Sequence, residues 1–459
     1  MLMLLLSAGC TFYTGPPTVQ GAPASGGQSG NGGLPSTPGG ELDGGAEPAG
    51  KWRNVTSNLA GLRSGCGNLA LVSAHPTLDM LIAGVANRAL WASTDGAETW
   101  HALGLGALST TVENVATSIV YDPATPEAFW ESGINGRVGI VKSIDLGRHF
   151  SRRGQSGSNE VISIDFNDPD RSTQLVGGHG QKQVIFRSSD AGETWDDIGK
   201  QFPANADAST YPLVIDANTY LMGAPEQVGG KAGIYLTIDA GATWSLVSPD
   251  GGQFAPLVAE DATIYWASTK GGGLVRSSDA GDTFTQVVGA GLLQSFSPLE
   301  LPDGRLVAAS SNHLVASTNH GKDWRFVSAK LPYAINGFTY SIAQKAFFVW
   351  HSTCVGENPV PKDAIMRFDF DFAAKGECVG PRLSLQDAIT LQGRCVPANA
   401  WGAMSKLILF SMIIAMIGIP ARAAREKNPH KGFRKAIIQS LIFDAIYAFA
   451  LVFLWGRWD

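Results

Sequence analysis

Short apolar runs alternate with turn-forming Gly, Ser, Asp and Asn residues through the middle of this chain. The first three runs are Leu69 to Ser73, Met80 to Val85 and Leu90 to Ser93. Runs of this length between turn residues are typical of β-strands. The pattern predicts an all-β domain over residues 51–372, with segments of a different kind at both ends.

An eight-residue motif follows the third apolar run of each group and occurs six times. Its clearest copy runs from Ser188 to Trp195, and the third positions of the copies lie 40 to 50 residues apart. Those third positions are Asp95, Asp145, Asp190, Asp239, Asp279 and Asn319. The period suits four short antiparallel strands, which bury both faces only when neighbouring units stack around an axis. The repeat therefore predicts a β-propeller.

These octapeptides resemble the Asp-box, or BNR repeat, of sialidase-like, xyloglucanase-like, sortilin-like and photosystem-assembly-factor-like propellers. Two copies depart from the pattern, because Ala97 replaces a glycine and Asn319 replaces the aspartate. In such a turn, between the third and fourth strands, hydroxyl and carboxylate groups accept backbone N–H bonds and glycine adopts positive φ. We interpret the box carboxylates as turn formers, since five carboxylates on five blades cannot converge on one substrate.

Three further strands, Gly337 to Ile342, Ala346 to Trp350 and Ile365 to Phe370, follow the last box without a box of their own. Their missing fourth strand is expected at the other end of the domain, where Lys51 to Val55 matches the strands that follow the boxes. Closure of this kind removes the open sheet edge. The expected fold is a seven-bladed propeller closed by its N-terminal strand.

Residues 1–10 form a brief apolar run that ends in small residues and Cys10, which resembles a bacterial lipoprotein signal with Cys10 lipidated. Ser7 and the lack of a preceding Lys or Arg depart from that pattern, and a plain secretory signal or a short buried segment is the alternative. Residues 11–50 are dominated by Gly, Pro, Ser and Ala, and we interpret them as a flexible tether.

The composition changes again after a connector at residues 373–400. Two apolar runs, 407–419 and 436–455, flank a basic stretch and predict a transmembrane helical hairpin over residues 401–459, with Asp444 near the middle of the second run. The basic loop would be cytoplasmic, which places the propeller on the extracytoplasmic face of a bacterial envelope membrane. That membrane is the inner one if the hairpin is genuine and otherwise the outer one. Alternatively, two genes were joined, and the hairpin is unrelated to the propeller.

The net charge is −6 for the whole chain. Residues 401–459 carry 8 Lys and Arg against 3 Asp and Glu, a net of +5, which leaves −11 on the remainder. An acidic propeller is a poor match for nucleic acid, whose phosphates require a basic surface. The glycine-rich stretches lack the lysine of a phosphate loop, and no cofactor is implied.

Four cysteines remain if Cys10 is lipidated, and they allow three disulfide connectivities. Pairing Cys66 with Cys354 would lock the ring, and pairing Cys378 with Cys395 would staple the connector. Metal binding is the competing interpretation. No pair has the short spacing of a zinc site, so no metal is predicted.

Loops between second and third strands should gather on the rim opposite the boxes, together with the links between blades. Glu113, Asn159 and Tyr211 would join this rim from the links. Candidate ligand contacts from the loops are Asn87, Arg88, Asn135, Arg137, His179, Lys182, Gln227, Lys270, Asn312 and His313.

Glu131, Glu160 and Glu226 are the carboxylates on that rim which could serve a glycoside hydrolase, an enzyme that needs two carboxylates facing one sugar. The arginine motif of sialidases is missing from the first blades, where Arg53, Arg63 and Arg88 stand alone. We therefore expect a membrane-tethered, non-catalytic binding or assembly module for an envelope protein or glycan. The alternative is a glycoside hydrolase of the Asp-box propeller type.

Overall fold

The structure is a computed structural model. It describes residues 48, 50–62, 69–136, 139–269, 273–287, 293–294, 296–310, 312–333, 335–352 and 363–372. The chain separates into two units, Met1–Phe370 and Asp371–Asp459, and nearly all described residues belong to the first. The lipoprotein-type signal, nearly all of the tether, the connector and the predicted hairpin lie outside the described residues. All five cysteines, Arg137 and Lys270 also lie outside them.

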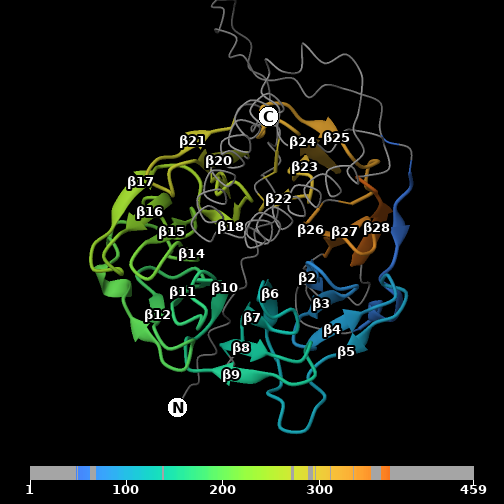
Figure 1. Cartoon of the computed structure of the whole chain (residues 1–459), viewed down its shortest axis with the longest axis horizontal. Helices are drawn as coiled ribbons and strands as arrows, with labels where there is room; N and C mark the ends of the chain where they lie inside the picture. The colour runs from blue at the N-terminus through green and yellow to red at the C-terminus, as the bar shows by residue number, and fades with distance from the viewer. Residues whose placement is uncertain are drawn as a thin grey trace, which may run out of the picture. The chain divides into compact units, whose positions relative to one another are not determined.

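The described strands form seven four-stranded antiparallel sheets, which confirms the predicted seven-bladed propeller. Figure 1 shows the blades arranged around one axis. Blades 1 to 3 contain β2 (Leu69–Ala74), β3 (Leu81–Val85), β4 (Leu90–Ser93) and β5 (His101–Ala102); β6 (Val115–Tyr121), β7 (Phe129–Ile134), β8 (Ile140–Ser143) and β9 (Ser151–Arg153); and β10 (Asn159–Ile164), β11 (Gln174–Gly178), β12 (Ile185–Ser188) and β13 (Asp196–Asp197).

Blades 4 to 6 follow the same order from the axis outward. They contain β14 (Tyr211–Val214), β15 (Tyr220–Ala224), β16 (Gly233–Thr237) and β17 (Ser245–Ser248); β18 (Gln253–Val258), β19 (Ile264–Ala267), β20 (Leu274–Ser277) and β21 (Thr285–Gln286); and β22 (Leu299–Glu300), β23 (Leu306–Ser310), β24 (His313–Ser317) and β25 (Arg325–Phe326). Two single 3-10 turns, η1 (Ser57–Leu59) and η2 (Gly199–Gln201), follow outer strands.

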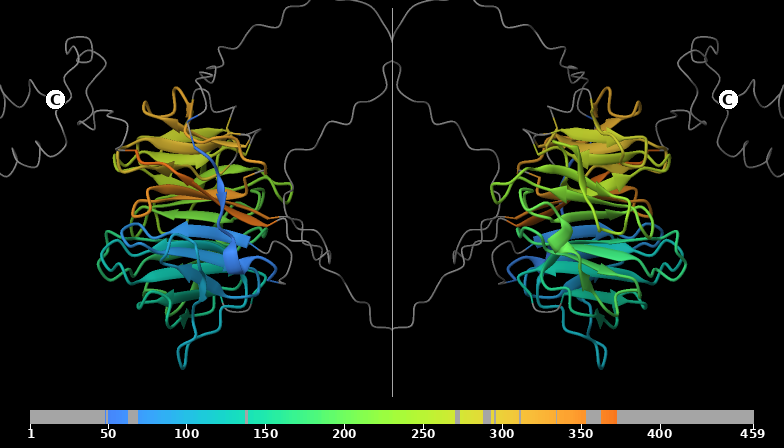
Figure 2. Two further views of the ribbon diagram at one scale, coloured as in Figure 1. Left: turned by 90° about the vertical axis from the view of Figure 1, so that its right-hand side faces the viewer. Right: turned by 90° about the vertical axis from the view of Figure 1, so that its left-hand side faces the viewer.

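Blade 7 joins the two ends of the ring. It consists of β26 (Gly337–Ser341), β27 (Ala346–His351), β28 (Ala364–Asp369) and, as its outer strand, β1 (Arg53–Asn54). Trp52 occupies the place of a box tryptophan, because its Nε1 donates to Ala329 O at 2.7 Å as Trp195 Nε1 donates to Arg153 O at 3.1 Å. The N-terminal strand therefore closes the ring, as predicted, and Figure 2 shows the blades from the side.

The hydrophobic core lies between adjacent blades. Between blades 1 and 2, for example, Ile82 and Leu90 pack with Phe129, Val141 and Phe150, all nearly inaccessible to solvent. Alternating strand residues face the two sides of a blade, so each blade supplies one wall to each of two such layers.

The eight-residue repeats form the turns between third and fourth strands. In each copy the hydroxyl of the first residue accepts the N–H of the fifth residue, as Ser188 Oγ does from Gly192 at 2.8 Å. The side chain of the third residue accepts the N–H of the seventh residue, as Asp190 Oδ1 does from Thr194 at 2.8 Å. These bonds satisfy donors that a tight turn leaves unpaired, and they lower the pKa of Asp190.

The two divergent copies keep the same turn. Ala97 adopts φ of +69°, a left-handed conformation that favours glycine, and is fully buried. In the sixth copy, Asn319 Nδ2 donates to Asp323 Oδ2 at 2.6 Å, so the carboxylate has moved to the seventh position. The turn therefore depends on the hydrogen-bond pattern and tolerates exchange of the groups that supply it.

Ser188→Ala is expected to destabilise the propeller by roughly 1–3 kcal/mol. The buried Ser188 Oγ accepts the Gly192 N–H and donates to Asp190 Oδ1, and the substitution removes the partner of both groups. Ser189 is its exposed neighbour in the same turn, and Ser189→Ala serves as the control, with an expected change within about 0.5 kcal/mol. Urea unfolding followed by tryptophan fluorescence measures both; equal midpoints would contradict the assignment.

Within the described part of the chain, no helix is long and apolar enough to cross a bilayer. The described residues also contain no group of three or more His, Cys, Asp or Glu side chains that could hold a metal ion.

Candidate functional site

The inner strands of the seven blades surround the axis and leave a mouth at each end. The inner strands start at one mouth, which we call the loop mouth, and the turns between second and third strands also lie there. The inner strands end at the other, which we call the turn mouth. Antiparallel pairing forces this division, because each strand reverses the direction of the one before it.

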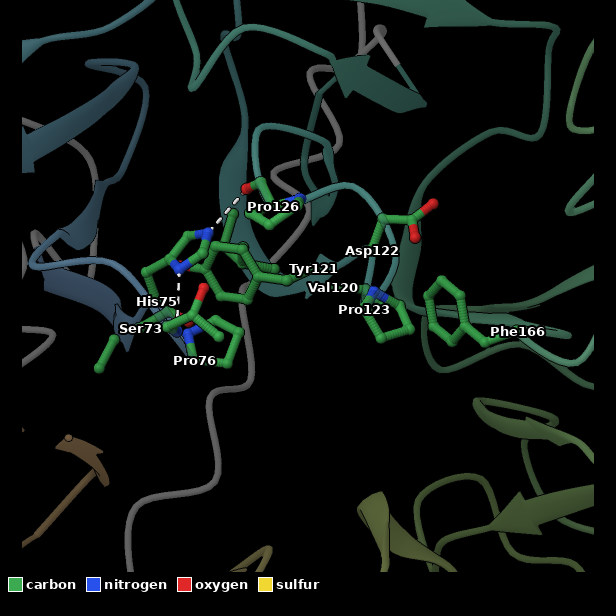
Figure 3. Close-up of a pocket in the computed structure, with 12 residues that line it drawn as sticks. Ser73, His75, Pro76, Val120, Tyr121, Asp122, Pro123, Pro126 and Phe166 are labelled. Atoms are coloured by element: carbon green, nitrogen blue, oxygen red, sulfur yellow. Dashed lines mark hydrogen bonds between the residues drawn. The ribbon is translucent and has the colours of Figure 1, made fainter. Parts of the chain in front are cut away.

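At the turn mouth lies a hollow of about 600 Å³, lined by the ends of β2 and β6, the turns that follow them, and Phe166. Figure 3 shows Phe166 facing Pro123, and the Tyr121 ring against His75. His75 Nε2 bonds Pro126 O at 2.7 Å, while its Nδ1 accepts N–H groups from Thr77 and Leu78.

Asp122 is likewise engaged within the wall, in an ion pair with Arg171 at 2.8 Å. Most of the hollow is apolar, and its imidazole and carboxylate groups hold the turns together. It therefore has little with which to orient a polar ligand or perform chemistry.

At the loop mouth the axis opens into a smaller cavity of about 190 Å³. Most of its lining comes from points where the pairing register of an inner strand shifts, which is the mark of a β-bulge. A bulge changes the direction of the side chains at that point. The bulged lining residues are Ala70 of β2, Thr117 of β6, Glu160 and Val161 of β10, and Phe254 and Ala255 of β18; Ser118, Tyr211 and Ser297 complete the lining.

Phe254 carries backbone strain at this cavity. Its φ is +59°, a conformation in which a bulky residue is an outlier. Its ring centroid lies 5.8 Å from that of Tyr211 and 5.5 Å from that of Phe296, and its carbonyl accepts Trp266 Nε1–H at 2.8 Å. These contacts hold Phe254 in the strained conformation, and strain of this kind is concentrated at functional sites.

Glu160 joins three blades at the cavity. Its Oε2 accepts the Tyr211 hydroxyl at 2.6 Å, and its Oε1 accepts Nδ1–H of His179. The Glu160 carbonyl accepts hydroxyls from Thr117 at 2.5 Å and Ser132 at 3.1 Å, which fixes the bulge from the neighbouring blade. The Glu160 side chain is 12 % exposed and that of His179 is 40 % exposed.

The charge of Glu160 changes the acidity of both partners. The hydrogen bond to Glu160 raises the pKa of His179, although partial burial opposes this. Burial, together with the nearby carboxylate, raises the pKa of Tyr211 well above its ordinary value. The cluster is thus a carboxylate held between a neutral phenol and an imidazole that readily accepts a proton.

Glu131, expected on the rim, lies instead inside blade 2 on β7 and is 0 % exposed. Its Oε1 accepts Asn114 Nδ2 at 2.9 Å, and no hydrogen bond to its Oε2 is found among the described residues. Burial raises the pKa of Glu131 to about 8. The sequence interpretation erred because the strand continues through this position, so the side chain points into the sheet packing.

Glu226 is exposed, in a turn after β15 that Asp207 holds by accepting N–H groups from Gln227, Val228 and Gly230. It is not part of the cavity lining. The three carboxylates proposed from the sequence therefore occupy three different environments, and Glu160 is the one at the cavity.

The other described candidates from the loops lie in the turns between second and third strands, except His313, which is the first residue of β24. His179 bonds Glu160, and none of these candidates is among the residues that line the cavity. Asn312 Nδ2 donates to Leu331 O at 3.2 Å, and the His313 ring packs on Phe326. The described rim candidates outside the lining are Asn87, Arg88, Asn135, His179, Lys182, Gln227, Asn312 and His313 from the loops, and Glu113 and Asn159 from the links.

Sequence reasoning did not identify Phe254 or Thr117. Thr117 follows the ordinary strand residues Val115 and Ala116. Gly251 and Gly252 before Phe254 indicate a turn, but they do not show which residue bulges. Tyr211 and Glu160 were expected on this rim from the links between blades, but their contact was not.

No family model matches the chain. Over 368 residues the chain is 23 % identical to a xyloglucanase of Hypocrea jecorina (strain QM6a), and the match covers 68 % of the chain and 42 % of the relative. The chain therefore spans less than half the length of this relative.

Two solved structures are similar in fold. The GH74 xyloglucanase of Xanthomonas campestris matches with 18 % identity and a TM-score of 0.46, covering 69 % of this chain and 55 % of that one. YCF48 bound to D1 peptide matches with 12 % identity and a TM-score of 0.48, covering 73 % and 99 %. These likenesses do not distinguish catalysis from binding.

Proposed function

We propose that the chain is a non-catalytic binding or assembly module that receives part of an envelope protein or glycan in the cavity at the loop mouth. The observation that carries this proposal is the isolation of Glu160 from other carboxylates and the hydrogen bonding of its side chain. It is the one carboxylate among the described lining residues, and both of its oxygens already accept hydrogen bonds. A glycoside hydrolase needs a second carboxylate roughly 5–9.5 Å away, across the sugar.

The proposal includes attachment to a bacterial membrane, through lipid at Cys10, through helices near 407–419 and 436–455, or through both. It rests on the sequence pattern of these segments alone. An extracytoplasmic propeller held in this way would meet envelope components rather than nucleic acid.

A glycoside hydrolase is the second candidate, and the 23 % identity to a xyloglucanase over 368 residues favours it. On this ring it would require Glu160 to act with a carboxylate from another part of the loop mouth. Neither Glu131, which is fully buried, nor Glu226, which is outside the lining, supplies that carboxylate.

We expect the full-length chain to release no reducing ends from xyloglucan or other envelope and plant β-glucans above a protein-free blank. We also expect it to retain a defined envelope protein or glycan in pull-down experiments, and Glu160→Gln to weaken that retention by about tenfold or more. Glu226→Gln is the matched control and should retain the ligand.

Hydrolysis that is present in the wild-type chain and lost in Glu160→Gln would overturn the binding proposal and establish the enzyme. Equal retention by wild type and Glu160→Gln would place the ligand elsewhere on the propeller. Thermal melting of each variant confirms that a lost function is not lost folding.

A further inference from the structure

The loop-mouth cavity has room for one narrow chemical group. Its volume is about 190 Å³. This is below the usual size of a pocket for a drug-sized ligand, about 300–1,000 Å³. A single extended side chain or a chain end fits, whereas a folded element does not.

The polar groups of the described lining favour a cation. Glu160 is its one charged residue, and a carboxylate has about four acceptor positions, of which His179 and Tyr211 use two. The hydroxyls of Thr117 and Ser297 already donate to backbone carbonyls, so each faces a ligand mainly as an acceptor. An anion would be repelled by the carboxylate and would find few donors.

The remaining walls contain two aromatic rings beside the aliphatic residues Ala70, Val161 and Ala255. The rings of Tyr211 and Phe254 lie 5.8 Å apart between centroids, and both line the cavity beside Glu160. Aromatic faces attract ammonium groups, and the attraction grows when the site is shielded from water. A carboxylate with two aromatic rings and hydroxyl acceptors is a suitable environment for an alkylammonium group.

We propose that the loop-mouth cavity binds a protonated primary amine, either a lysine side chain or the amino terminus of a partner protein, against Glu160, Tyr211 and Phe254. This inference rests on the proposed binding function and names its ligand chemistry. The alkyl chain of the ligand would pass the aromatic rings while its ammonium group uses the free acceptor positions of Glu160.

His179 competes with the amine for Glu160. As an imidazolium it neutralises the carboxylate, and as a neutral imidazole it leaves the negative charge available. Glu160 is the charged group that acts on His179, and Tyr211 is uncharged over this range. Lys182 is exposed in the same turn as His179, and Glu226 is exposed in the corresponding turn of the next blade. Amine binding should therefore strengthen as the pH rises through the pKa of His179. It should weaken again when the ligand amine loses its proton, near pH 10 for a lysine side chain and near pH 8 for an amino terminus.

The test is a titration of the full-length chain, observed by NMR or calorimetry, with Nα-acetyl-lysine methylamide and its uncharged analogue Nα-acetyl-norleucine methylamide. We expect the lysine probe to bind at least about tenfold more tightly than the norleucine probe, and more tightly at pH 8.5 than at pH 6. Norleucine methylamide with a free α-amine, titrated at pH 7 where an α-amine is still largely protonated, tests the amino terminus as the alternative source of the ammonium group.

Glu160→Gln preserves the size of the side chain and should reduce amine binding by about tenfold or more, while Glu226→Gln should leave it unchanged. Equal binding of the lysine and norleucine probes, or binding of methyl glucoside in place of both amines, would overturn the inference. If neither amine binds but the chain still retains its envelope ligand through Glu160, the inference fails while the proposed function stands.

Discussion

Replacing Glu131 by glutamine should stabilise the propeller at neutral pH, by roughly 3 kcal/mol at pH 7. Burial raises the pKa of the Glu131 carboxyl from 4.5 to about 8. Between these values the folded chain holds a proton that the unfolded chain releases. Wild-type stability therefore falls as the pH rises from about 5 to about 8, by roughly 1.4 kcal/mol per pH unit for this group, and the fall stops above that window.

The substituted glutamine has nearly the shape of the protonated acid and can still accept Asn114 Nδ2–H, but it does not titrate. Its advantage over the wild type should be small at pH 5 and increase towards pH 8. Urea unfolding at pH 5, 6, 7 and 8 measures this difference. Glu226→Gln, at an exposed position, should follow the wild type at every pH. Parallel curves for the wild type and Glu131→Gln would show that Glu131 is ionised in the folded chain.

Arg171→Ala should destabilise the propeller by roughly 3–5 kcal/mol. Arg171 and Asp122 are nearly buried, with side chains 9 % and 6 % exposed, and they join the turns of blades 2 and 3 at 2.8 Å. Arg171 also donates to the carbonyls of Phe166 and Asp168. Its removal would leave the Asp122 carboxylate without its cation, and two carbonyls without these donors.

The exposed pair of Arg53 and Glu98, whose side chains are 52 % and 60 % exposed, provides the control for this prediction. Arg53→Ala should cost at most about 1 kcal/mol, because water screens exposed charges. The double change Asp122→Ala with Arg171→Ala should cost less than the sum of the single changes, since neither charge is then left unpaired. Equal unfolding midpoints for Arg171→Ala and Arg53→Ala would contradict the burial argument.

The blade count and the closure were predictable because both depend on local chemistry that recurs. Each repeat places a hydroxyl and a carboxylate or amide acceptor where a turn needs them. Trp52 makes the hydrogen bond of a repeat tryptophan although no octapeptide precedes it. Glu131 shows the limit of this reasoning. The run Glu131-Ser132-Gly133 is polar and predicts a loop, whereas β7 continues through it and buries Glu131.

The sequence by itself determined the order of the strands, the number of blades and the rim on which second-to-third-strand loops gather, because strand alternation and turn chemistry act over a few residues. The tertiary structure decided which side chains meet. Ring closure brings together the starts of the inner strands, from Ala70 to Ser297. The bulges depend on strand pairing, and they direct Thr117, Glu160 and Phe254 towards the axis. The contact of Glu160 with His179 and Tyr211, which are 19 and 51 residues away, follows from that geometry and not from any local pattern.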